Sequence, residues 1–419
     1  MSSSTERWLL KKLYAAAGRP PVVMALQGGP EVGPAEAAPV AKLVIHDRTT
    51  LVRIALNPEL AFGEAYAEGG VEVEGDLLAL LDAVYSAMSR HKGRAWYPRL
   101  ASLCLRLTQG NSRRGSRHNI HHHYDIGNQF YQLWLDRNLL YTCAYFPEPE
   151  ATLEEAQVAK MDHVCRKVRL QPGERIVEAG CGWGSLALHM ARQYGVKVKA
   201  FNISHEQIVY ARWRAQQEGL DGRVEFIQDD YRNIHGRFDA FISVGMLEHV
   251  GREHYRELSR VVHRSVGDSG RGLLHFIGRN WPRPLNAWVR KHIFPGAYPP
   301  TLREMMEIFE PWDFAVLDVE NLRLHYARTL EHWLERFERS KQQVADMFDE
   351  RFVRMWRLYL AGSAAAFHTG TMQLFQVIFA GSECKAIPWT RAHLYEAEPE
   401  PTERLQSVPS PPYSVPRAR

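Results

Sequence analysis

The chain has 419 residues, of which 45% are hydrophobic and 24% charged, and its formal net charge is +4 at pH 7. This composition excludes a wholly disordered chain, a fibrous chain and a strongly basic nucleic-acid packaging protein. At about 150 residues per domain, the length predicts two or three domains. Five cysteines without a CxxC pair indicate reduced thiols and favour a cytoplasmic protein. No apolar run approaches the ~20 residues of a membrane-spanning helix, so any membrane contact is expected to be peripheral.

Residues 1–112 predict a small α/β accessory domain that interacts with lipid. Residues 6–16 have the spacing of a short amphipathic helix, which fits either a membrane surface or packing on its own domain. The Gly-, Pro- and Ala-rich stretch 18–39 predicts a loop or linker. Alternation over 42–56 favours strands, and 76–88 has helical spacing.

Residues 109–123 form a polar, glycine-broken segment that predicts an exposed connector. Its cations Arg113, Arg114 and Arg117 fit either a solvated linker or contact with an anionic membrane. The three consecutive histidines at 121–123 do not predict a metal site, because they point in different directions on regular backbone. No acidic residue or cysteine lies at ligand spacing from them.

Residues 113–395 predict a second, larger domain. Up to about residue 280, short apolar strands alternate with helical stretches, which predicts an α/β fold with a doubly wound, mostly parallel sheet. Residues 300–380 are expected to be mostly helical. The tail 396–419 contains six prolines and is predicted to be disordered.

A glycine-rich turn follows the first apolar strand, in the sequence IVEAGCGWGS (176–185). Glycines at 180, 182 and 184 allow a ligand to approach the backbone at the carboxyl end of the strand. Glu178 would repel the pyrophosphate of a dinucleotide but suits the cationic amino-acid part of S-adenosylmethionine. With Trp183, this string resembles the first motif of class I methyltransferases, which have a Rossmann-like fold.

Polar residues after the next two strands continue the expected cofactor site. They are Asn202, Ile203 and Gln207, followed by Asp229 or Asp230 and then Tyr231. Gln207 is expected to contact the ribose hydroxyls, and Ile203 to cover the adenine. One of the two aspartates is expected to accept from the adenine amino group, with Tyr231 beside the ring.

Several further segments carry a family resemblance. They are HHHYDIGNQFYQLWLD (121–136), LYTCAYF (140–146), GMLEHVG (245–251), RGLLHFIGRN (271–280), IFPGAYPP (293–300) and LHYARTLEHWLERF (324–337). Together they resemble the cyclopropane-fatty-acyl-phospholipid synthase family, which includes the mycolic acid cyclopropane synthases. The resemblance runs from about residue 118 to 392. A weaker similarity over 60–77 matches the longer, phospholipid-acting branch.

The resemblance implies that a methylene group passes from S-adenosylmethionine to the cis double bond of unsaturated acyl chains in membrane phospholipids. It implies a carbocation that a bound bicarbonate deprotonates. The matching bicarbonate-site positions are Cys143, Glu248, His275, Ile277 and Tyr326. Tyr141 and Thr142 match cofactor contacts. The resemblance also implies a homodimer at the inner face of the membrane.

Phe276, Phe294 and Tyr298 are candidates for the aromatic walls of an acyl channel, because aromatic rings tolerate a cation. Ser363 stands where many family members have a cysteine, a change that we interpret as tolerated packing. The helix around Arg290 and Lys291 is a further candidate membrane contact.

Three alternatives to cyclopropane formation remain open at this point. The same methyl transfer can end in a methyl-branched or methylene chain. The chain can instead be an ordinary small-molecule methyltransferase, against which the extra N-terminal domain counts. A catalytically inactive lipid-binding protein is the third alternative, and the retained Glu248, His275 and Tyr326 count against it.

Overall fold

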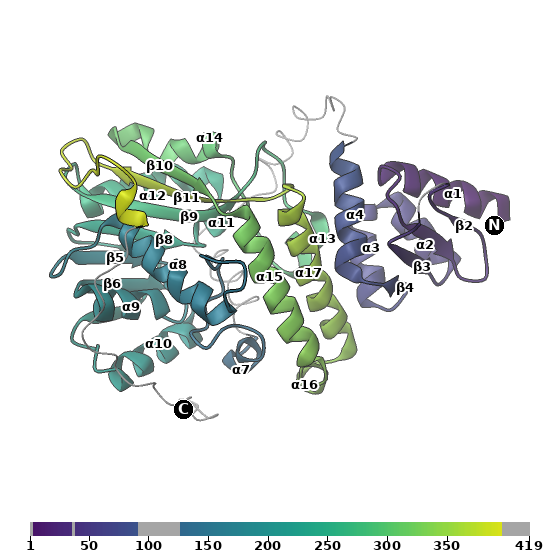
Figure 1. Cartoon of the computed structure of the whole chain (residues 1–419), viewed down its shortest axis with the longest axis horizontal. Coiled ribbons are helices and arrows are strands. Elements are labelled where there is room, and N and C mark those ends of the chain that lie inside the picture. Colours follow the sequence, from purple (N-terminus) through teal and green to yellow (C-terminus); the bar gives the residue numbers. More distant parts are fainter. Residues whose placement is uncertain (1–2, 36–37, 91–125, 396–419) are drawn as a thin grey trace.

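Two β-sheets organise the computed structural model, which describes residues 3–35, 38–90 and 126–395 (Figure 1). The N-terminal region, residues 3–90, has a four-stranded sheet in the order β2-β1-β3-β4. Its elements are α1 (Ser3–Ala16), β1 (Val23–Leu26), β2 (Glu31–Val32), β3 (Ala41–Ile45), α2 (Arg48–Leu56), α3 (Pro58–Ala67), β4 (Val71–Gly75) and α4 (Leu77–Arg90). The predicted α/β character and the helices near 6–16 and 76–88 are confirmed.

Two expectations for this region were wrong in part. Residues 42–56 were expected to be strands, but only β3 is extended and α2 occupies the second half. The Asp47 side chain accepts a hydrogen bond from the Thr50 N–H at 2.9 Å and so starts that helix. Leu51 and Ile54 then face the core at helical spacing. The stretch 18–39, expected to be a loop, contains β1 and β2.

The C-terminal region, residues 126–395, contains a seven-stranded sheet in the order β10-β11-β9-β8-β5-β6-β7. Its strands are β5 (Arg175–Ala179), β6 (Lys197–Asn202), β7 (Val224–Gln228), β8 (Ala240–Val244), β9 (Arg271–Gly278), β10 (Ala315–Asn321) and β11 (Gln373–Ala380). Neighbouring strands from β7 to β9 are parallel, whereas β11 is antiparallel to both β9 and β10. The predicted doubly wound, mostly parallel sheet is confirmed.

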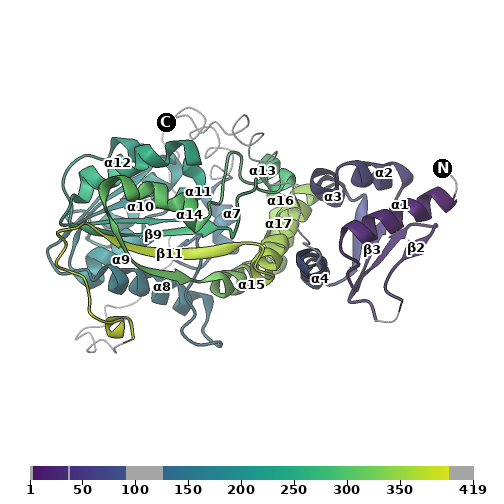
Figure 2. The same cartoon turned by 90° about the horizontal axis from the view of Figure 1, so that it is seen from above.

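Helices cover both faces of this sheet (Figure 2). The α-helices are α7 (Asn128–Gln132), α8 (Leu153–Val168), α9 (Ser185–Tyr194), α10 (His205–Gln217), α11 (Leu247–Val250), α12 (Tyr255–Val266), α13 (Ala287–His292), α14 (Leu302–Met305), α15 (Arg323–Arg339), α16 (Lys341–Met347) and α17 (Glu350–His368). The helical expectation for 300–380 missed β10 and β11. β11 is buried at every position, so its apolar run has no alternation to distinguish it from a buried helix.

The two regions share one hydrophobic core. A single buried cluster extends from Leu10 and Tyr66 in the N-terminal region to Trp333 and Trp356 on α15 and α17. Figures 1 and 2 both show α3 and α4 against α17. The predicted domain limit at 112/113, the basic connector with its histidines and the Pro-rich tail all lie outside the described residues.

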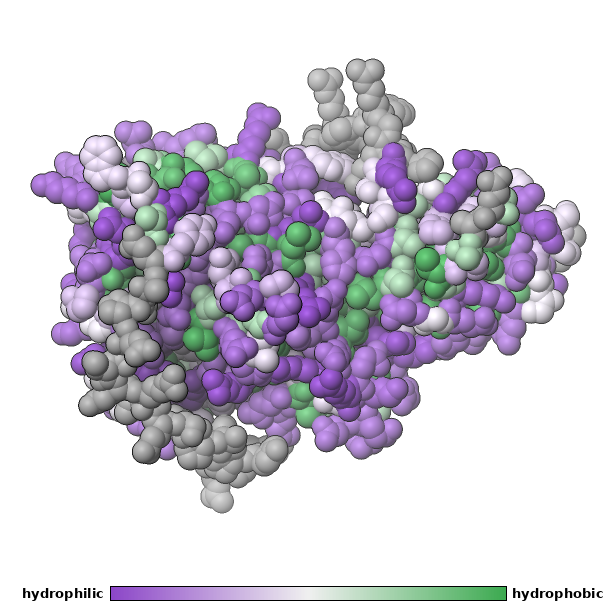
Figure 3. Space-filling view, viewed as in Figure 1, coloured by the Kyte–Doolittle hydropathy of each residue, from purple (hydrophilic) through white to green (hydrophobic). Residues whose placement is uncertain are grey.

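One face of the molecule shows how polar and apolar residues are distributed over its surface. The face drawn in Figure 3 is largely hydrophilic, with smaller hydrophobic areas scattered over it. Across the described ranges, no helix is long and apolar enough to span a bilayer.

Candidate active site

The glycine-rich turn forms one wall of a pocket of about 140 Å³ at the carboxyl end of β5. Gly180, Gly182 and Gly184 all have positive φ, at +85°, +55° and +85°, so only glycine adopts this turn without strain. Eleven of the predicted cofactor residues line the pocket. They are Tyr141, Thr142, Glu178, Gly180, Gly182, Trp183, Asn202, Ile203, Gln207, Asp230 and Tyr231.

Gly184 is the predicted cofactor residue that does not line this pocket. It precedes α9, and a Cβ atom on it would lie 2.5 Å from the Phe226 ring. Its role in the structure is close packing of the helix against the sheet. Gly182 differs, because a Cβ atom there would meet no described atom within 4 Å.

Two buried charged groups set the electrostatics of the pocket. Burial raises the pKa of Glu178 to about 8, and its Oε2 atom has no hydrogen-bond partner among the described residues. Burial also lowers the pKa of Lys160 to about 8, and its ammonium donates to Thr142 Oγ1 at 2.7 Å. A cationic ligand group beside the unpartnered Glu178 oxygen would lower this pKa and favour the carboxylate, so the pocket suits the cationic part of S-adenosylmethionine and not a pyrophosphate.

The sequence analysis missed Lys160 because a lysine on a helix is normally exposed. A signal was nevertheless present in the spacing of α8. Leu153, Ala156, Met161 and Val164 form its buried face, and Lys160 falls at the same helical positions. A lysine on the apolar face of an amphipathic helix indicates a buried partner or a functional site.

The adenine side of the pocket is already internally hydrogen-bonded in part. The Asn202 amide donates to Gln207 Oε1 at 2.7 Å. Arg232 engages both Asp230 carboxylate oxygens, through its backbone N–H and its guanidinium, each at 2.9 Å. Asp229 lines the pocket beside it. Both aspartates therefore stay candidates for the adenine contact.

A second, larger cavity of about 730 Å³ adjoins this pocket. Tyr141, Thr142, Gly245 and His249 line both spaces. All five residues predicted for the bicarbonate site line the larger cavity, namely Cys143, Glu248, His275, Ile277 and Tyr326. The structure thus brings together residues from four distant parts of the chain, next to the pocket for the cofactor.

Glu248 lies on α11, directly after the turn that ends β8. Its Oε1 atom accepts a hydrogen bond from the Ile277 N–H, and its Oε2 atom has no partner among the described residues. Burial raises the pKa of this carboxyl to about 7. Burial thus brings the protonation of Glu248 close to neutral pH, where the carboxylate accepts hydrogen bonds and the protonated form can also donate one.

His275 faces the cavity from β9, directly across the sheet from Gln376 on β11. The Gln376 amide donates to His275 Nδ1 at 2.9 Å, which leaves the ring proton on Nε2. That Nε2 atom is buried and has no partner in the described chain. Burial, and then the charge of Lys160, lower the pKa of His275, so the ring is a neutral donor.

Cys143 and Tyr326 complete the predicted set. The Cys143 thiol donates to the Ala144 carbonyl at 3.1 Å, and burial raises its pKa, so it is not a thiolate. Tyr326 lies on α15 with its ring against Phe367, 4.6 Å between centroids. Both side chains are buried.

Aromatic side chains surround the same space. Phe294, Tyr141, Tyr326, Tyr359 and Phe367 line it. Phe294 was expected there, but Phe276 and Tyr298 were expected as well and do not line it. Alternation along β9 turns Phe276 to the opposite face, and the Tyr298 hydroxyl donates to Glu304 at 2.8 Å.

The N-terminal region supplies the rest of the wall, which the sequence analysis did not foresee. Apolar side chains from α1 to α4 line the far part of the cavity, among them Met24, Ile45, Ile54, Phe62 and Leu81. Ser363 on α17 also lines it. Within the described ranges, no cluster of three or more His, Cys, Asp or Glu side chains is arranged to hold a metal ion.

Comparisons with known proteins agree with this geometry. The family described as mycolic acid cyclopropane synthetase matches residues 111–377, and a domain of unknown function matches residues 28–93. A probable fatty acid methyltransferase of Pseudomonas putida is 37% identical over 347 residues, which cover 80% of this chain and 86% of that protein. Cyclopropane-fatty-acyl-phospholipid synthase of Escherichia coli (strain K12) is 40% identical over 259 residues, 62% of this chain and 66% of that protein.

A solved structure of mycolic acid cyclopropane synthase CmaA1, complexed with SAH and CTAB, superposes with a TM-score of 0.60 at 28% identity. The match covers 63% of this chain and 97% of that one. The predicted family resemblance is confirmed. The chain belongs to the mycolic acid cyclopropane synthetase family and is an S-adenosylmethionine-dependent, lipid-modifying methyltransferase.

Proposed function

We propose that this enzyme forms cyclopropane rings on the cis double bonds of unsaturated acyl chains in membrane phospholipids. One observation carries the proposal. Among the buried polar atoms of the cavity beside the cofactor pocket that have no partner in the described chain are an acceptor, Glu248 Oε2, and a donor, His275 Nε2. Buried polar groups without partners are costly unless a ligand completes them.

Bicarbonate fits this pair of groups. Its hydroxyl can donate to Glu248 while one of its oxygens accepts from His275, and Tyr326 lies in the same wall. The positive charge of Lys160 acts on His275, and the same charge favours an anion there. These residues would hold the ion, and Gln376 would keep the His275 proton on the nitrogen that faces it.

The reaction needs an electrophilic methyl group and a base, and both must act inside a cavity with mostly apolar walls. The glycine-rich turn and Glu178 would hold S-adenosylmethionine, which would supply an electrophilic methyl group to the alkene. Glu248 and His275 would hold bicarbonate, which would supply the base for the proton that leaves on ring closure. The chain's own residues exclude water, and Tyr141, Tyr326 and Phe294 present aromatic rings to positive charge on the acyl chain.

The alternative product is a methyl-branched or methylene chain. It forms when the same carbocation gains a hydride or loses a proton without closing the ring. The Pseudomonas putida relative is described as a probable fatty acid methyltransferase. The unpaired Glu248 and His275 groups suit an anion that takes a proton, which supports ring closure over a hydride-ended methyl branch. A methylene chain also requires proton loss, so the labelling experiment separates it from ring closure.

We also infer that the enzyme works in the cytoplasm, against the inner face of the membrane, as a homodimer. Trp8 on α1 is 56% exposed and Lys12 lies over its ring, which suits an anionic interface. Lys291 on α13 contributes less to membrane contact than expected, since it donates to Glu64 of the N-terminal region at 2.7 Å.

The test is lipid mass spectrometry in cells whose phospholipids carry cis-unsaturated acyl chains, fed with methionine deuterated in its methyl group. Wild-type protein is expected to add the mass of one CH2 group with two of the three label atoms retained. Ozonolysis should then find no double bond at that position. Glu248→Gln should lose the product, and the exposed Glu335→Gln on α15 should keep it.

Each other outcome has a defined meaning. Retention of all three label atoms would show a methyl branch, and retention of two with an ozone-sensitive bond would show a methylene chain. Either result would overturn ring closure. Absence of labelled lipid with wild-type protein would overturn the lipid substrate itself.

A further inference from the structure

The cavity contains two cations in a wall that is otherwise mostly apolar. Of the described residues that line the cavity, two carry a positively charged lysine or arginine side chain, namely Arg279 and Arg283. They lie where α4 meets the C-terminal region. Arg279 follows β9 directly, so alternation places it on the same face as His275 and Ile277. One strand thus presents both the proposed reaction groups and this cation to the cavity.

Arg279 is held firmly yet incompletely paired. Its side chain is 5% exposed, and one guanidinium nitrogen donates to the Pro284 carbonyl at 2.7 Å. Its Nε atom is buried and has no hydrogen-bond partner among the described residues. A buried guanidinium without a carboxylate partner is costly, and burial lowers its pKa to about 9.

Arg283 lies beside it. Its guanidinium is 5.0 Å from the centroid of the Trp281 ring and donates weakly to the Thr371 carbonyl at 3.4 Å. The carboxylate that acts on both arginines is Glu59, which is exposed. Two cations and one carboxylate leave a net positive charge, which a singly charged anion would neutralise.

We propose that Arg279 and Arg283 bind the phosphate ester of the acyl lipid substrate, so that this site selects a phospholipid. The proposal rests on the proposed function and assigns the part of the lipid that the reaction groups do not contact. Arginine matches phosphate oxygens with paired N–H donors, and the free Nε atom of Arg279 supplies one.

The placement along β9 suits this assignment. At a rise of about 3.3 Å per residue along a strand, the Cα atoms of Arg279 and His275 are about 13 Å apart. That separation leaves room for the glycerol unit and the acyl segment that precedes the reacting double bond. The apolar part of the cavity lined by Phe62 and Leu81 is available to the second acyl chain.

Binding of a short-chain lipid tests the site without requiring turnover. Calorimetry would compare dihexanoyl phosphatidylglycerol with dihexanoylglycerol, which lacks the phosphate. Arg279→Lys and Arg283→Gln should each weaken phosphatidylglycerol binding roughly 10- to 100-fold and leave dihexanoylglycerol binding unchanged. Arg339→Gln on exposed α15 surface is the matched control and should bind as wild type. Thermal unfolding would verify that the variants are folded.

Wild-type affinity in both cavity variants, or equal losses for both lipids, would overturn the proposal. Inorganic phosphate should compete only weakly, and competition as strong as that of phosphatidylglycerol would overturn the lipid assignment. Phospholipid binding that depends on the arginines, in a protein that transfers no label, would refute the proposed function and leave the site standing. Label transfer to lipid by a protein whose phospholipid binding does not depend on the arginines would support the proposed function and refute the phosphate site.

Discussion

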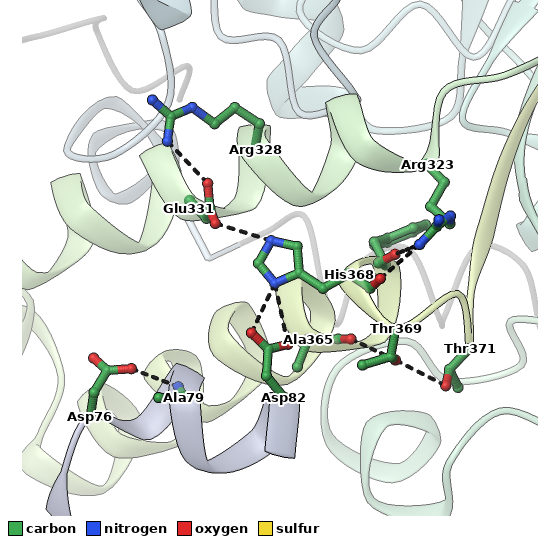
Figure 4. A network of polar contacts seen from close by, with 11 residues as sticks. Asp76, Ala79, Asp82, Arg323, Arg328, Glu331, Ala365, His368, Thr369 and Thr371 are labelled. Atoms are coloured by element: carbon green, nitrogen blue, oxygen red, sulfur yellow. Dashed lines mark hydrogen bonds and ion pairs between the residues drawn. The ribbon is translucent and has the colours of Figure 1, made fainter. Parts of the chain in front are cut away.

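Two groups of polar side chains, one partly exposed and one buried, differ in whether the chain itself satisfies their hydrogen bonds. Where α4 meets α15 and α17, His368 contacts Asp82 and Glu331 through its two ring nitrogens, each at 3.0 Å (Figure 4). In the reaction cavity, Glu248 and His275 each keep one polar atom without a partner in the described chain. The first group connects the two regions, and the second leaves positions that a ligand can complete.

The contrast shows how to separate structural from functional polar residues in a molecule of this kind. His368 finds its partners within the chain. The core residues Trp134 and Trp333 also keep an Nε1 atom that is unpaired within the described chain, so an unpaired atom points to a ligand only where the residue lines a cavity. A residue that binds a ligand leaves a hydrogen-bonding atom for that ligand, which lowers the stability of the ligand-free protein. The following substitutions test that distinction.

The largest effect is expected for Glu248→Gln. Loss of the carboxylate should lower product formation about 10²- to 10⁴-fold, because a neutral amide is a weaker acceptor for the bicarbonate hydroxyl and orients that ion less well. The free energy of unfolding should rise by about 1–3 kcal/mol at pH 8, since burial raises the pKa of Glu248 to about 7 and its charged form disfavours folding. Labelled lipid and urea unfolding measure the two quantities.

The same pKa predicts a pH profile for the wild-type enzyme. If the carboxylate form is needed, kcat/KM should rise as pH increases through about 7. A profile that is flat from pH 5 to 9, or an unfolding free energy that Glu248→Gln lowers, would place Glu248 among the structural residues instead.

The glycine-rich turn contains one position of each kind. Gly184→Ala should cost about 2–4 kcal/mol in unfolding free energy, because its φ is +85° and the new Cβ would meet Phe226 at 2.5 Å. Gly182→Ala should cost about 1 kcal/mol and mainly weaken S-adenosylmethionine binding. Thermal unfolding and calorimetry compare the two variants, and similar profiles for both would contradict the distinction.

Gln376→Leu tests a residue that acts through another. Without the amide donor, the His275 proton can move to Nδ1, away from the cavity. We expect a loss of about tenfold in kcat with little change in the KM for S-adenosylmethionine, as for outer partners of ligating histidines. Gln376→Glu would accept instead of donate and favour the other tautomer, so it should be at least as impaired. Full activity in both variants would remove the positioning role.

His368→Gln should have a smaller effect, confined to stability. The hydrogen bonds with Asp82 and Glu331 raise the pKa of His368 to about 9, so its contribution is complete below about pH 6.5 and is lost as pH rises through about 9. Urea unfolding should show a loss of about 1–2 kcal/mol at pH 6 that disappears by pH 10. The exposed His235→Gln is the control. A difference that grows with pH would contradict the assignment.

The smallest effect is expected for Ser363→Cys. Ser363 lines the cavity, and the proposed mechanism uses no thiolate. Burial keeps even the Cys143 thiol of the same cavity protonated. Turnover within about twofold of wild type is expected from a near-isosteric change. A gain of tenfold or more would show that a cysteine at this position takes part in catalysis.

The sequence predicted the parts of the site that depend on local order along the chain. The turn after β5, the residues after β6 and β7, and Glu248 after β8 all follow from where parallel strands end. The family resemblance added Cys143, His275 and Tyr326, which no local pattern would have selected. The sheet class followed from the alternation of strands and helices.

What the sequence did not predict depends on contacts between distant segments. Gln376 reaches His275 only because β11 pairs with β9 in one register. Phe276 is different, because it faces the opposite side from His275 through side-chain alternation along β9, which is a local rule. The lining by Phe62 and Leu81 requires the docking of the N-terminal region against α17, which no single segment encodes. Lys160 was visible only as an exception on a buried helix face.

Both regions of the chain contribute residues to the wall of the large cavity, and the two sets of residues would have different roles. The groups proposed for the chemistry belong to the C-terminal region, whereas Met24, Ile45 and Phe62 shape the far end of the space from the N-terminal region. Exchanging residues 3–90 between related proteins would therefore change which chain lengths fit and leave the reacting groups in place. The proposed bond-making groups and the walls that would set the length of the acyl chain thus come from different regions of the chain.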